Sequence, residues 1–248
     1  LFNSDTSMTN VNSNLSLDGD LMQRVDTDVL APDGTLIWSL EQTSGRGRRG
    51  REWQSPSGNL YTSLILRPEV PLYEAAQLGF VASLAVFDAL GNIGPPGHQV
   101  HCKWPNDVLL NEKKVAGILL ESSGERGDTP SDWIILGMGL NVAWHPDNTQ
   151  FPATSLRFEG WSNTLDEVIA AYTRSFLLWT NRWIDSGFAP IRKDWMWRCK
   201  GIGEKIEVRL ENETLIGIFE DMEEDGALRL NINGKLERIN AGDVFFTS

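Results

Sequence analysis

The C-terminal part of the chain carries the pattern that most restricts its fold. From about Gly201, apolar and polar residues alternate in short runs, and the pairs Asp225-Gly226 and Asn233-Gly234 stand between runs. Such pairs favour the two-residue turns that join antiparallel strands, and alternation is typical of strands with one buried face. The runs cover residues 205–210, 214–221, 227–232 and 235–239. We therefore predict a small antiparallel β-barrel over residues 200–248.

The preceding residues mix helix-like and strand-like patterns. Apolar residues recur at helical spacing over residues 74–90 and 165–183, and residues 188–198 predict a shorter helix. Runs rich in Leu, Ile and Val predict strands at residues 35–40, 60–67, 100–104, 108–110, 114–120 and 133–142. The expected fold class is α+β, with a domain over residues 1–199 whose mixed sheet is flanked by helices.

Composition narrows the class of protein. The 248 residues include 34 acidic against 22 basic side chains, and a net charge of −12 opposes sequence-independent binding to DNA or RNA. No apolar run approaches the ~20 residues that cross a bilayer, and the first ten residues show no signal peptide. Cys102 and Cys199 fit neither a disulfide framework nor a zinc spacing, which favours a reducing cytoplasm and a buried structural role.

An arginine-rich loop stands out against this acidic background. Residues 45–51 read Gly-Arg-Gly-Arg-Arg-Gly-Arg, without any apolar period. Glycine lets a loop close over a ligand, and the guanidinium fork suits carboxylate and phosphate oxygens. We expect a loop that orders over a bound anion. A solvated basic turn or an RNA-binding patch is the alternative interpretation of the same residues.

A second polar segment, Lys103-Trp104-Pro105-Asn106-Asp107, joins two predicted strands, and Lys114 enters the next one. Lysine is almost never fully buried unless it is paired, so a lysine that enters a buried strand beside small residues is unusual. Position alone favours the simpler interpretation, in which Lys114 belongs to an exposed turn. Trp53 and Trp104 are more often core residues than ligand platforms, and the chain has ten tryptophans.

The order and spacing of these segments closely resemble the catalytic domain of bacterial biotin protein ligases. The tail is similar to the small C-terminal domain of the same family. The matching stretches are residues 42–51 with Trp53, 56–66, 103–107, 114–121 and 137–142. The resemblance implies a class II synthetase-like catalytic domain followed by an SH3-like β-barrel. It also implies an enzyme that forms biotinyl-5'-AMP from biotin and ATP and transfers biotin to a lysine of a biotin carboxyl carrier protein.

The resemblance assigns residues to three overlapping sets. The implied catalytic residues are Lys114, Arg48, Asp107 and Lys103. The implied biotin-binding residues are Thr6, Ser7, Gln42, Arg46, Gly47, Arg48, Lys114 and Gly117. The implied adenylate-binding residues are Arg51, Trp53, Asn106 and Asn141. Gly117, Gly137 and Gly139 match glycines that let the backbone approach the ligand. No protein-held metal is expected, because Mg²⁺ would travel with ATP.

Within these assignments, Lys114 is expected to contact the biotin carboxylate and the phosphate. Arg46, Gly47 and Arg48 would fold over the intermediate and keep water out. Asp107 is expected to receive or orient the lysine amine of the carrier. The chain departs from the family near its start, where Thr6 and Ser7 align with the hydroxyl pair that binds the ureido ring. A shifted alignment uses Thr9 and Asn10 instead.

Two other functions are left open by the sequence. One is a lipoate-type ligase or acyltransferase on a related fold, and the other is a nucleic-acid-binding module that uses the arginine loop. Some family members carry an N-terminal helix-turn-helix, whereas none precedes Asp5 here, so repression of transcription is not expected. The oligomeric state is open, and a homodimer is one option.

Overall fold

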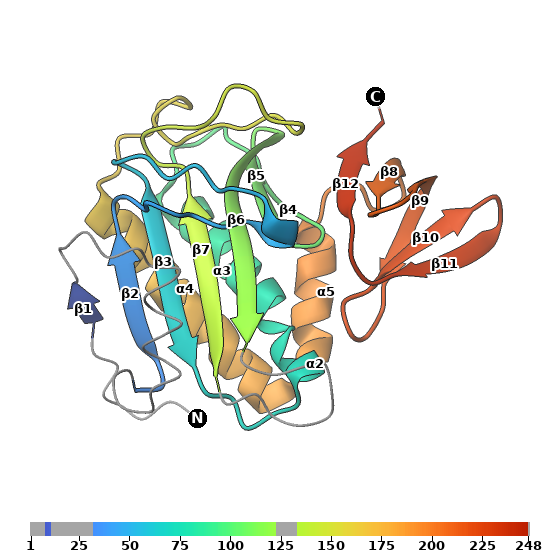
Figure 1. Ribbon diagram of the computed structural model, residues 1–248, viewed down its shortest axis with the longest axis horizontal. Coiled ribbons are helices and arrows are strands. Elements are labelled where there is room, and N and C mark those ends of the chain that lie inside the picture. The colour runs from blue at the N-terminus through green and yellow to red at the C-terminus, as the bar shows by residue number, and fades with distance from the viewer. Residues whose placement is uncertain (1–7, 11–31, 123–132, 248) are drawn as a thin grey trace.

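The structure is a computed structural model that describes residues 8–10, 32–122 and 133–247, and it contains two separate sheets (Figure 1). The strands of the larger sheet are β1 (Met8–Asn10), β2 (Thr35–Ser39), β3 (Leu60–Leu66), β4 (Val100–Lys103), β5 (Asp107–Leu110), β6 (Lys113–Ser122) and β7 (Ile134–Leu140). The helical elements are η1 (Arg48–Gly50), α2 (Leu72–Ala75), α3 (Leu78–Ile93), α4 (Leu165–Ser186) and α5 (Phe188–Arg198). The smaller sheet contains β8 (Lys205–Arg209), β9 (Thr214–Met222), β10 (Leu228–Ile232), β11 (Lys235–Ile239) and β12 (Asp243–Phe246).

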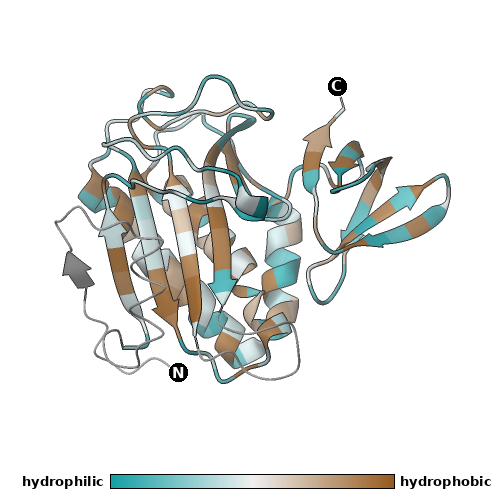
Figure 2. Ribbon diagram, viewed as in Figure 1, coloured by the Kyte–Doolittle hydropathy of each residue, from teal (hydrophilic) through white to brown (hydrophobic). Residues whose placement is uncertain are grey.

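The larger sheet is mixed, as predicted. Its strand order is β1-β2-β3-β7-β6-β5-β4, and β1 runs parallel to β2 while the other neighbours are antiparallel. All seven residues of β3 are buried, which is typical of a strand covered on both faces. The central strands are correspondingly apolar in Figure 2.

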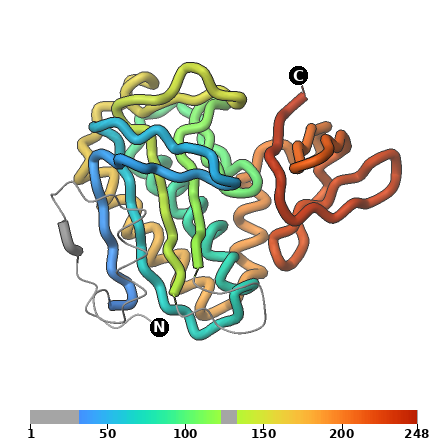
Figure 3. Tube along the Cα trace, in the orientation of Figure 1, coloured from blue at the N-terminus to red at the C-terminus, as the bar shows by residue number. Residues whose placement is uncertain are grey.

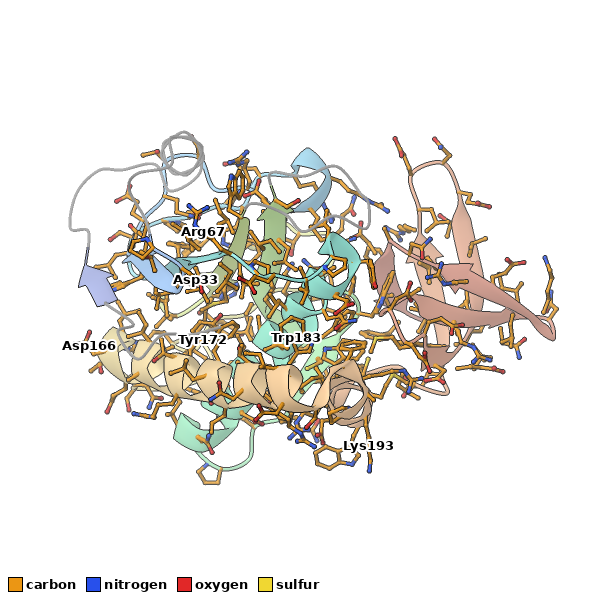
Figure 4. The ribbon with its side chains drawn as sticks, turned by 90° about the horizontal axis from the view of Figure 1, so that it is seen from below. Asp33, Arg67, Asp166, Tyr172, Trp183 and Lys193 are labelled. Atoms are coloured by element: carbon orange, nitrogen blue, oxygen red, sulfur yellow. The ribbon has the colours of Figure 1, made fainter. Side chains whose placement is uncertain are left out.

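Helices α3 and α4 cover one face of the sheet (Figure 1). A capping box at Thr164 begins α4, with the Thr164 hydroxyl and the Glu167 carboxylate each accepting the other's backbone N–H. Tyr172 and Trp183 lie on the inner side of α4, whereas Asp166 and Lys193 are exposed (Figure 4). The core therefore sits between the sheet and these two helices.

The prediction of a single helix at residues 74–90 is wrong in one respect, because the structure has two helices there, α2 and α3. Gln77 interrupts the run: its backbone N–H donates to Glu74, three residues earlier, and its side-chain oxygen accepts from Trp183 Nε1 at 2.8 Å. The stretch Leu72–Ile93 is also long and apolar enough to cross a membrane by length and composition, contrary to expectation. Of its most apolar window, 61% is buried in the protein, which accounts for its composition.

The five-stranded sheet has the order β11-β10-β9-β8-β12 and forms the small barrel predicted from the turn pairs. It follows α5 directly in the chain and lies beside the end of the larger sheet (Figure 3). Trp104 Nε1 donates to Gly226 O at 3.0 Å, and Arg192 on α5 pairs with Asp221 at 2.6 Å. Strand β12 was not among the predicted strands. The boundary between residues 199 and 200 stays a prediction.

Buried contacts also join the start of the barrel to β4. Lys200 N donates to Cys102 O at 2.9 Å, and Cys199 forms an isolated parallel bridge with Cys102. Burial raises the pKa of the Cys102 thiol to about 12, so this thiol is protonated and unreactive near neutral pH. The contacts fit the structural role expected of these two cysteines.

Candidate active site

Two glycines on neighbouring strands form the floor of the candidate site. Gly117 on β6 lies directly opposite Gly139 on β7, on the sheet face away from α3. A Cβ atom at Gly139 would lie 2.6 Å from the indole of Trp53, and one at Gly117 would lie 3.0 Å from the same ring. Any larger side chain at either position would displace the indole. The ring of Trp53 therefore lies across both glycines, as a platform above the sheet, and is only half-buried.

The floor continues along the same face. Gly137 pairs with Ser63 on β3 and with Leu119 on β6, and the backbone of Leu119 passes 3.5 Å from where a Cβ at Gly137 would lie. Gly117, Gly137 and Gly139 add no side chains to this face of the sheet, and we call the strip of sheet face beside the Trp53 ring the trough. Further along, Ile37, Ile65, Ile135 and Trp133 form a separate apolar cluster. The trough thus has an apolar end and, at the Trp53 end, a charged one.

The arginine loop folds back on itself between β2 and β3. Gly47 N donates to Arg51 O at 2.7 Å, and Trp53 N donates to Gly45 O at 2.9 Å. Gly45 is buried, and a Cβ there would lie 2.3 Å from Trp53 O, so the close approach of the two loop arms requires glycine. In Figure 1 this segment, in blue, crosses in front of β7 and β6 toward the barrel. Gln42 sits at the loop's root, where its Oε1 accepts from Ser55 Oγ at 2.8 Å.

Arg48 connects the loop to two other parts of the chain. Its Nη1 donates to Asn106 Oδ1 and to Gly242 O, both at 3.3 Å. Burial lowers the pKa of Arg48, and Asp243 and Asp107 oppose that shift. A guanidinium held between the β4–β5 turn and the barrel is well placed to meet a phosphate.

The other loop arginines have acidic partners. Arg51 Nη2 lies 2.8 Å from Asp243 Oδ1, Arg49 Nη1 lies 3.8 Å from Asp243 Oδ2, and Arg46 Nη1 lies 3.6 Å from Glu121 Oε1. Asp243 belongs to β12 of the barrel, and sequence reasoning missed it. No local signal marks it, since its partners precede it by more than 190 residues.

Two lysines share one buried carboxylate. Lys103 Nζ lies 3.1 Å from Asp107 Oδ2, and Lys114 Nζ lies 2.6 Å from Asp107 Oδ1. Burial alone would raise the pKa of Asp107, but the two ammonium groups outweigh burial and lower it from 3.8 to about 2. Burial lowers the pKa of Lys103, against the attraction of Asp107. The trio therefore carries one net positive charge when all three groups are ionised.

The two lysines differ in their surroundings. The Lys103 side chain is only 5% exposed and lies 4.1 Å from the ring centroid of Phe151. Lys114 is 25% exposed and lies 5.1 Å from the ring of Trp53. Lys114 is on β6, so the alternative that placed it in an exposed turn is wrong. Lys114 is the ammonium that faces the trough.

Two asparagines fix the backbone around the site. Asn141 is buried, and its Nδ2 donates to Thr154 O at 3.0 Å while its N donates to Val115 O at 2.8 Å. Asn59 was not predicted, yet its Oδ1 accepts three backbone N–H groups, those of Val142, Ala143 and Trp144, at 2.9, 2.9 and 3.0 Å. Sequence offered no signal for this role beyond an Asn before a strand.

Most of the residues predicted for the site lie together. Hydrogen bonds, ion pairs and close contacts bring together Arg48, Asn106, Asp107, Lys103, Lys114, Trp53, Gly117 and Gly139. Arg46, Arg51 and Gln42 lie in the loop above them, and Asn141 follows β7. The structure does not describe Thr6 and Ser7, the predicted hydroxyl pair. The side chains of Thr9 and Asn10, the alternative pair, also lie outside what it describes. Within residues 32–122 and 133–247, no three His, Cys, Asp or Glu side chains are grouped so as to hold a metal ion.

A groove of about 600 Å³ leads away from this cluster. Arg48 and Asn106 form one part of its wall, β6 and α2 form others, and the barrel turn at Gly226 lines the far side. It opens where β5 has ended and β6 continues. Of the cluster residues, Arg48 and Asn106 line this groove.

Two sequence models of known protein families match this chain. Residues 52–197 match the sequence model of the Biotin/lipoate A/B protein ligase family, and residues 201–247 match that of the Biotin protein ligase C terminal domain. The chain is 42% identical over 216 residues to "Biotin--[acetyl-CoA-carboxylase] ligase" of Paracoccus denitrificans, covering 85% of this chain and 89% of that protein. It is 36% identical to "Bifunctional ligase/repressor BirA" of Bacillus subtilis, covering 86% of this chain and 66% of that protein.

Solved structures show a similar fold. The biotin protein ligase of Aquifex aeolicus, in complex with biotin and ATP, superposes with a TM-score of 0.75 at 26% identity and covers 97% of both chains. The superposition therefore includes the larger sheet, its helices and the barrel. It supports the expected synthetase-like domain with an SH3-like barrel.

Proposed function

Since this chain belongs to the biotin/lipoate A/B protein ligase family, we propose that it is a biotin protein ligase. It is an ATP-dependent ligase that forms biotinyl-5'-AMP and transfers biotin to a specific lysine of a biotin carboxyl carrier protein. The curated relatives that match are biotin ligases, which favours biotin over lipoate. The charge of −12 and the acidic partners of the loop arginines disfavour the nucleic-acid-binding alternative.

The arrangement of Lys114 carries the proposal. Its ammonium stands between the Asp107 carboxylate and the Trp53 ring, above the glycine floor. A ligand lying in the trough would place its carboxylate beside this ammonium, with its apolar body along the floor. The indole of Trp53 would then lie against the adenylate end, because stacking on a flat ring suits a purine.

The first step brings together two anions, the biotin carboxylate and the α-phosphate of ATP. A carboxylate oxygen bonds to the α-phosphorus while the bond to the pyrophosphate oxygen breaks. Lys114 and Arg48 would offset the repulsion and stabilise the charge that develops on the phosphate oxygens. Lys103 keeps Asp107 ionised and paired, so that Lys114 can turn toward the phosphate without leaving an unpaired buried carboxylate.

In the second step, a neutral lysine amine of the carrier attacks the acyl carbon, AMP leaves with the electron pair of the broken C–O bond, and the attacking nitrogen releases one proton to solvent. Asp107 does not suit the role of proton acceptor, because a carboxylate with a pKa of about 2 accepts protons poorly near neutral pH. We assign Asp107 the role of orienting the amine and the two lysines. Asn106 and Asn141 would hold the adenylate, and Arg51 would lie near its phosphate.

Arg46, Gly47 and Arg48 would act as the lid over the adenylate. Arg48 already bridges to Asn106 and to Gly242, so closure needs only small movements. A closed lid excludes the water that would hydrolyse the mixed anhydride. An Arg48→Gly variant should release biotinyl-5'-AMP faster, and equal retention by parent and variant would remove Arg48 from the lid.

Several finer points belong to the same proposal. The carrier domain of an acetyl-CoA carboxylase is the acceptor to test, given the name of the Paracoccus relative. Mg²⁺ would arrive bound to the triphosphate. Thr6 and Ser7 would bond the ureido ring. We also propose that the protein works in the cytoplasm and has no DNA partner. A homodimer is one option for its oligomeric state.

The direct test is biotin-dependent exchange between ATP and labelled pyrophosphate, followed by transfer to a carrier domain. We expect exchange with biotin, none with lipoate, and a biotinylated carrier lysine. A Lys114→Ala variant run in parallel controls for contaminating ligase. Exchange with lipoate alone would favour the related ligase, and exchange with neither substrate would exclude both.

A further inference from the structure

A partly buried carboxylate outside the ligand-facing cluster, that of Glu159, organises the chain beside Lys114. Glu159 Oε1 accepts from the hydroxyl of Thr154 at 2.6 Å, and its Oε2 accepts from Asn111 Nδ2 at 2.7 Å. Lys113 Nζ lies 3.8 Å from the same carboxylate, whose side chain is 11% exposed. Hydrogen bonds to a charged and largely buried acceptor are stronger than neutral ones. Glu159 therefore fixes two partners that are separated along the chain.

The first partner, Thr154, contacts two site residues, Lys114 and Asn141, through its backbone. Thr154 N donates to Lys114 O at 2.9 Å, and Thr154 O accepts from Asn141 Nδ2 at 3.0 Å. Two residues earlier, Pro152 O accepts from Lys114 N at 2.8 Å. Both main-chain polar groups of Lys114 are thus held by one short segment. Thr154 is fully buried, so water does not compete for its contacts.

The second partner, Asn111, begins the hairpin turn that precedes Lys114. Its backbone has a φ of 48°, in the left-handed region that Asn tolerates better than most residues. Its N donates to Gln99 O at 2.8 Å, which ties the turn to the segment before β4. Glu159 consequently holds the hairpin turn and the segment at Thr154 in one arrangement, with Lys114 between them.

We propose that Glu159, acting through Thr154, is a positioning residue that sets where Lys114 and Asn141 stand for adenylate formation. This inference rests on the proposed function, because those two residues are assigned there to the phosphate and the adenylate. Neither Glu159 nor Thr154 touches the trough-facing atoms. Their effect is geometric: a displacement of about 1 Å at a reacting group can cost on the order of a hundredfold in rate.

The test compares three variants of the full-length chain. Thr154→Val removes the hydroxyl at nearly constant volume, and Thr154→Ser keeps it. Thr180→Val is the matched control, because Thr180 is a buried threonine on α4 whose hydroxyl has no partner among the described residues. In biotin-dependent ATP–pyrophosphate exchange, we expect Thr154→Val to lower kcat about ten- to a hundredfold and to raise KM for ATP. Thr154→Ser should stay within about threefold of the parent, and Thr180→Val should be unchanged.

Thermal unfolding separates positioning from a loss of folded protein. Thr154→Val should remain folded at the assay temperature while kcat falls. Equal kinetics of parent and Thr154→Val, or equal impairment by Ser and Val, would overturn the inference. If the parent itself shows no biotin-dependent exchange, the proposed function fails. A crystal structure of Thr154→Val then decides on the positioning role, which predicts longer distances from Lys114 N to Pro152 O and from Lys114 Nζ to Asp107 Oδ1.

Discussion

Lys114 and Asp107 form the shortest ion pair of the candidate site, with Nζ 2.6 Å from Oδ1, although Asp107 is already paired with Lys103. The Asp107 carboxylate would thus keep one ion-pair partner if the other moved away. Lys103 is almost completely buried, whereas a quarter of the Lys114 side chain is exposed. Lys114 can therefore turn to a substrate anion while Asp107 stays paired with Lys103.

Lys114→Ala should reduce adenylate formation about a hundred- to a thousandfold, because it removes the ammonium that faces the developing phosphate charge. Rapid quench with labelled ATP measures that step directly. Lys193→Ala is the matched control, since Lys193 is exposed on α5 (Figure 4). A variant at position 114 that forms the adenylate at the parental rate would show that another group stabilises the phosphate.

Because of Asp107, the free energy of unfolding should depend on pH in the acid range between about 4 and 2. Its folded pKa of about 2 lies below the ordinary 3.8, so its contribution is present above pH 4 and is lost as the pH falls toward 2. We expect the difference in unfolding free energy between the parent and Asp107→Asn to shrink by roughly 2 kcal/mol across that window. Chemical denaturation at several pH values measures it. A difference that stays constant from pH 5 to pH 2 contradicts the assigned charge state.

Gly139→Ala should weaken biotin and ATP binding by about tenfold or more, because the added Cβ would lie 2.6 Å from the Trp53 indole and displace the ring. Isothermal titration measures the loss. Gly91→Ala on α3 is the control: nothing lies within 4 Å of its added Cβ, and alanine favours the helix. Unchanged binding by Gly139→Ala would mean that Trp53 is not a platform for the ligand.

Asp243→Asn should loosen the arginine loop, since it removes the charge that holds Arg49 and Arg51. Exposed ion pairs contribute about 0–1 kcal/mol each, so we expect trypsin to cleave after these arginines a few-fold faster. Asp225→Asn, which removes a barrel partner of Arg238, is the matched control. If both variants are cleaved like the parent, the barrel does not restrain the loop.

Much of the fold follows from local patterns. The strand runs predicted β2 to β7 because buried strands carry continuous apolar residues, and the Asp-Gly and Asn-Gly turns predicted the β9–β10 and β10–β11 hairpins. Strand β12 was missed because residues 243–246 read as a short run without a turn pair. The break at Gln77 was missed because its cause is a tertiary contact with Trp183.

Some residues of the candidate site could also be predicted from the sequence, and others could not. Arg48, Lys103, Asp107 and Lys114 stand in segments whose composition is unusual for a loop or a strand, so they could be singled out. Asp243, Asn59 and Glu159 could not, because each sits in an ordinary polar context and has at least one partner dozens of positions away. Long-range hydrogen bonds and ion pairs leave no periodic trace in a sequence.

The contacts of Arg48 and Arg51 with Gly242 and Asp243 have a consequence for biosynthesis. A ribosome makes the arginine loop early and its barrel partners almost two hundred residues later. A nascent chain that has already folded its larger sheet must therefore wait for β12 before the loop acquires these restraints. Premature termination just ahead of residue 242 would remove β12 and, with it, the contacts that Gly242 and Asp243 make with the loop.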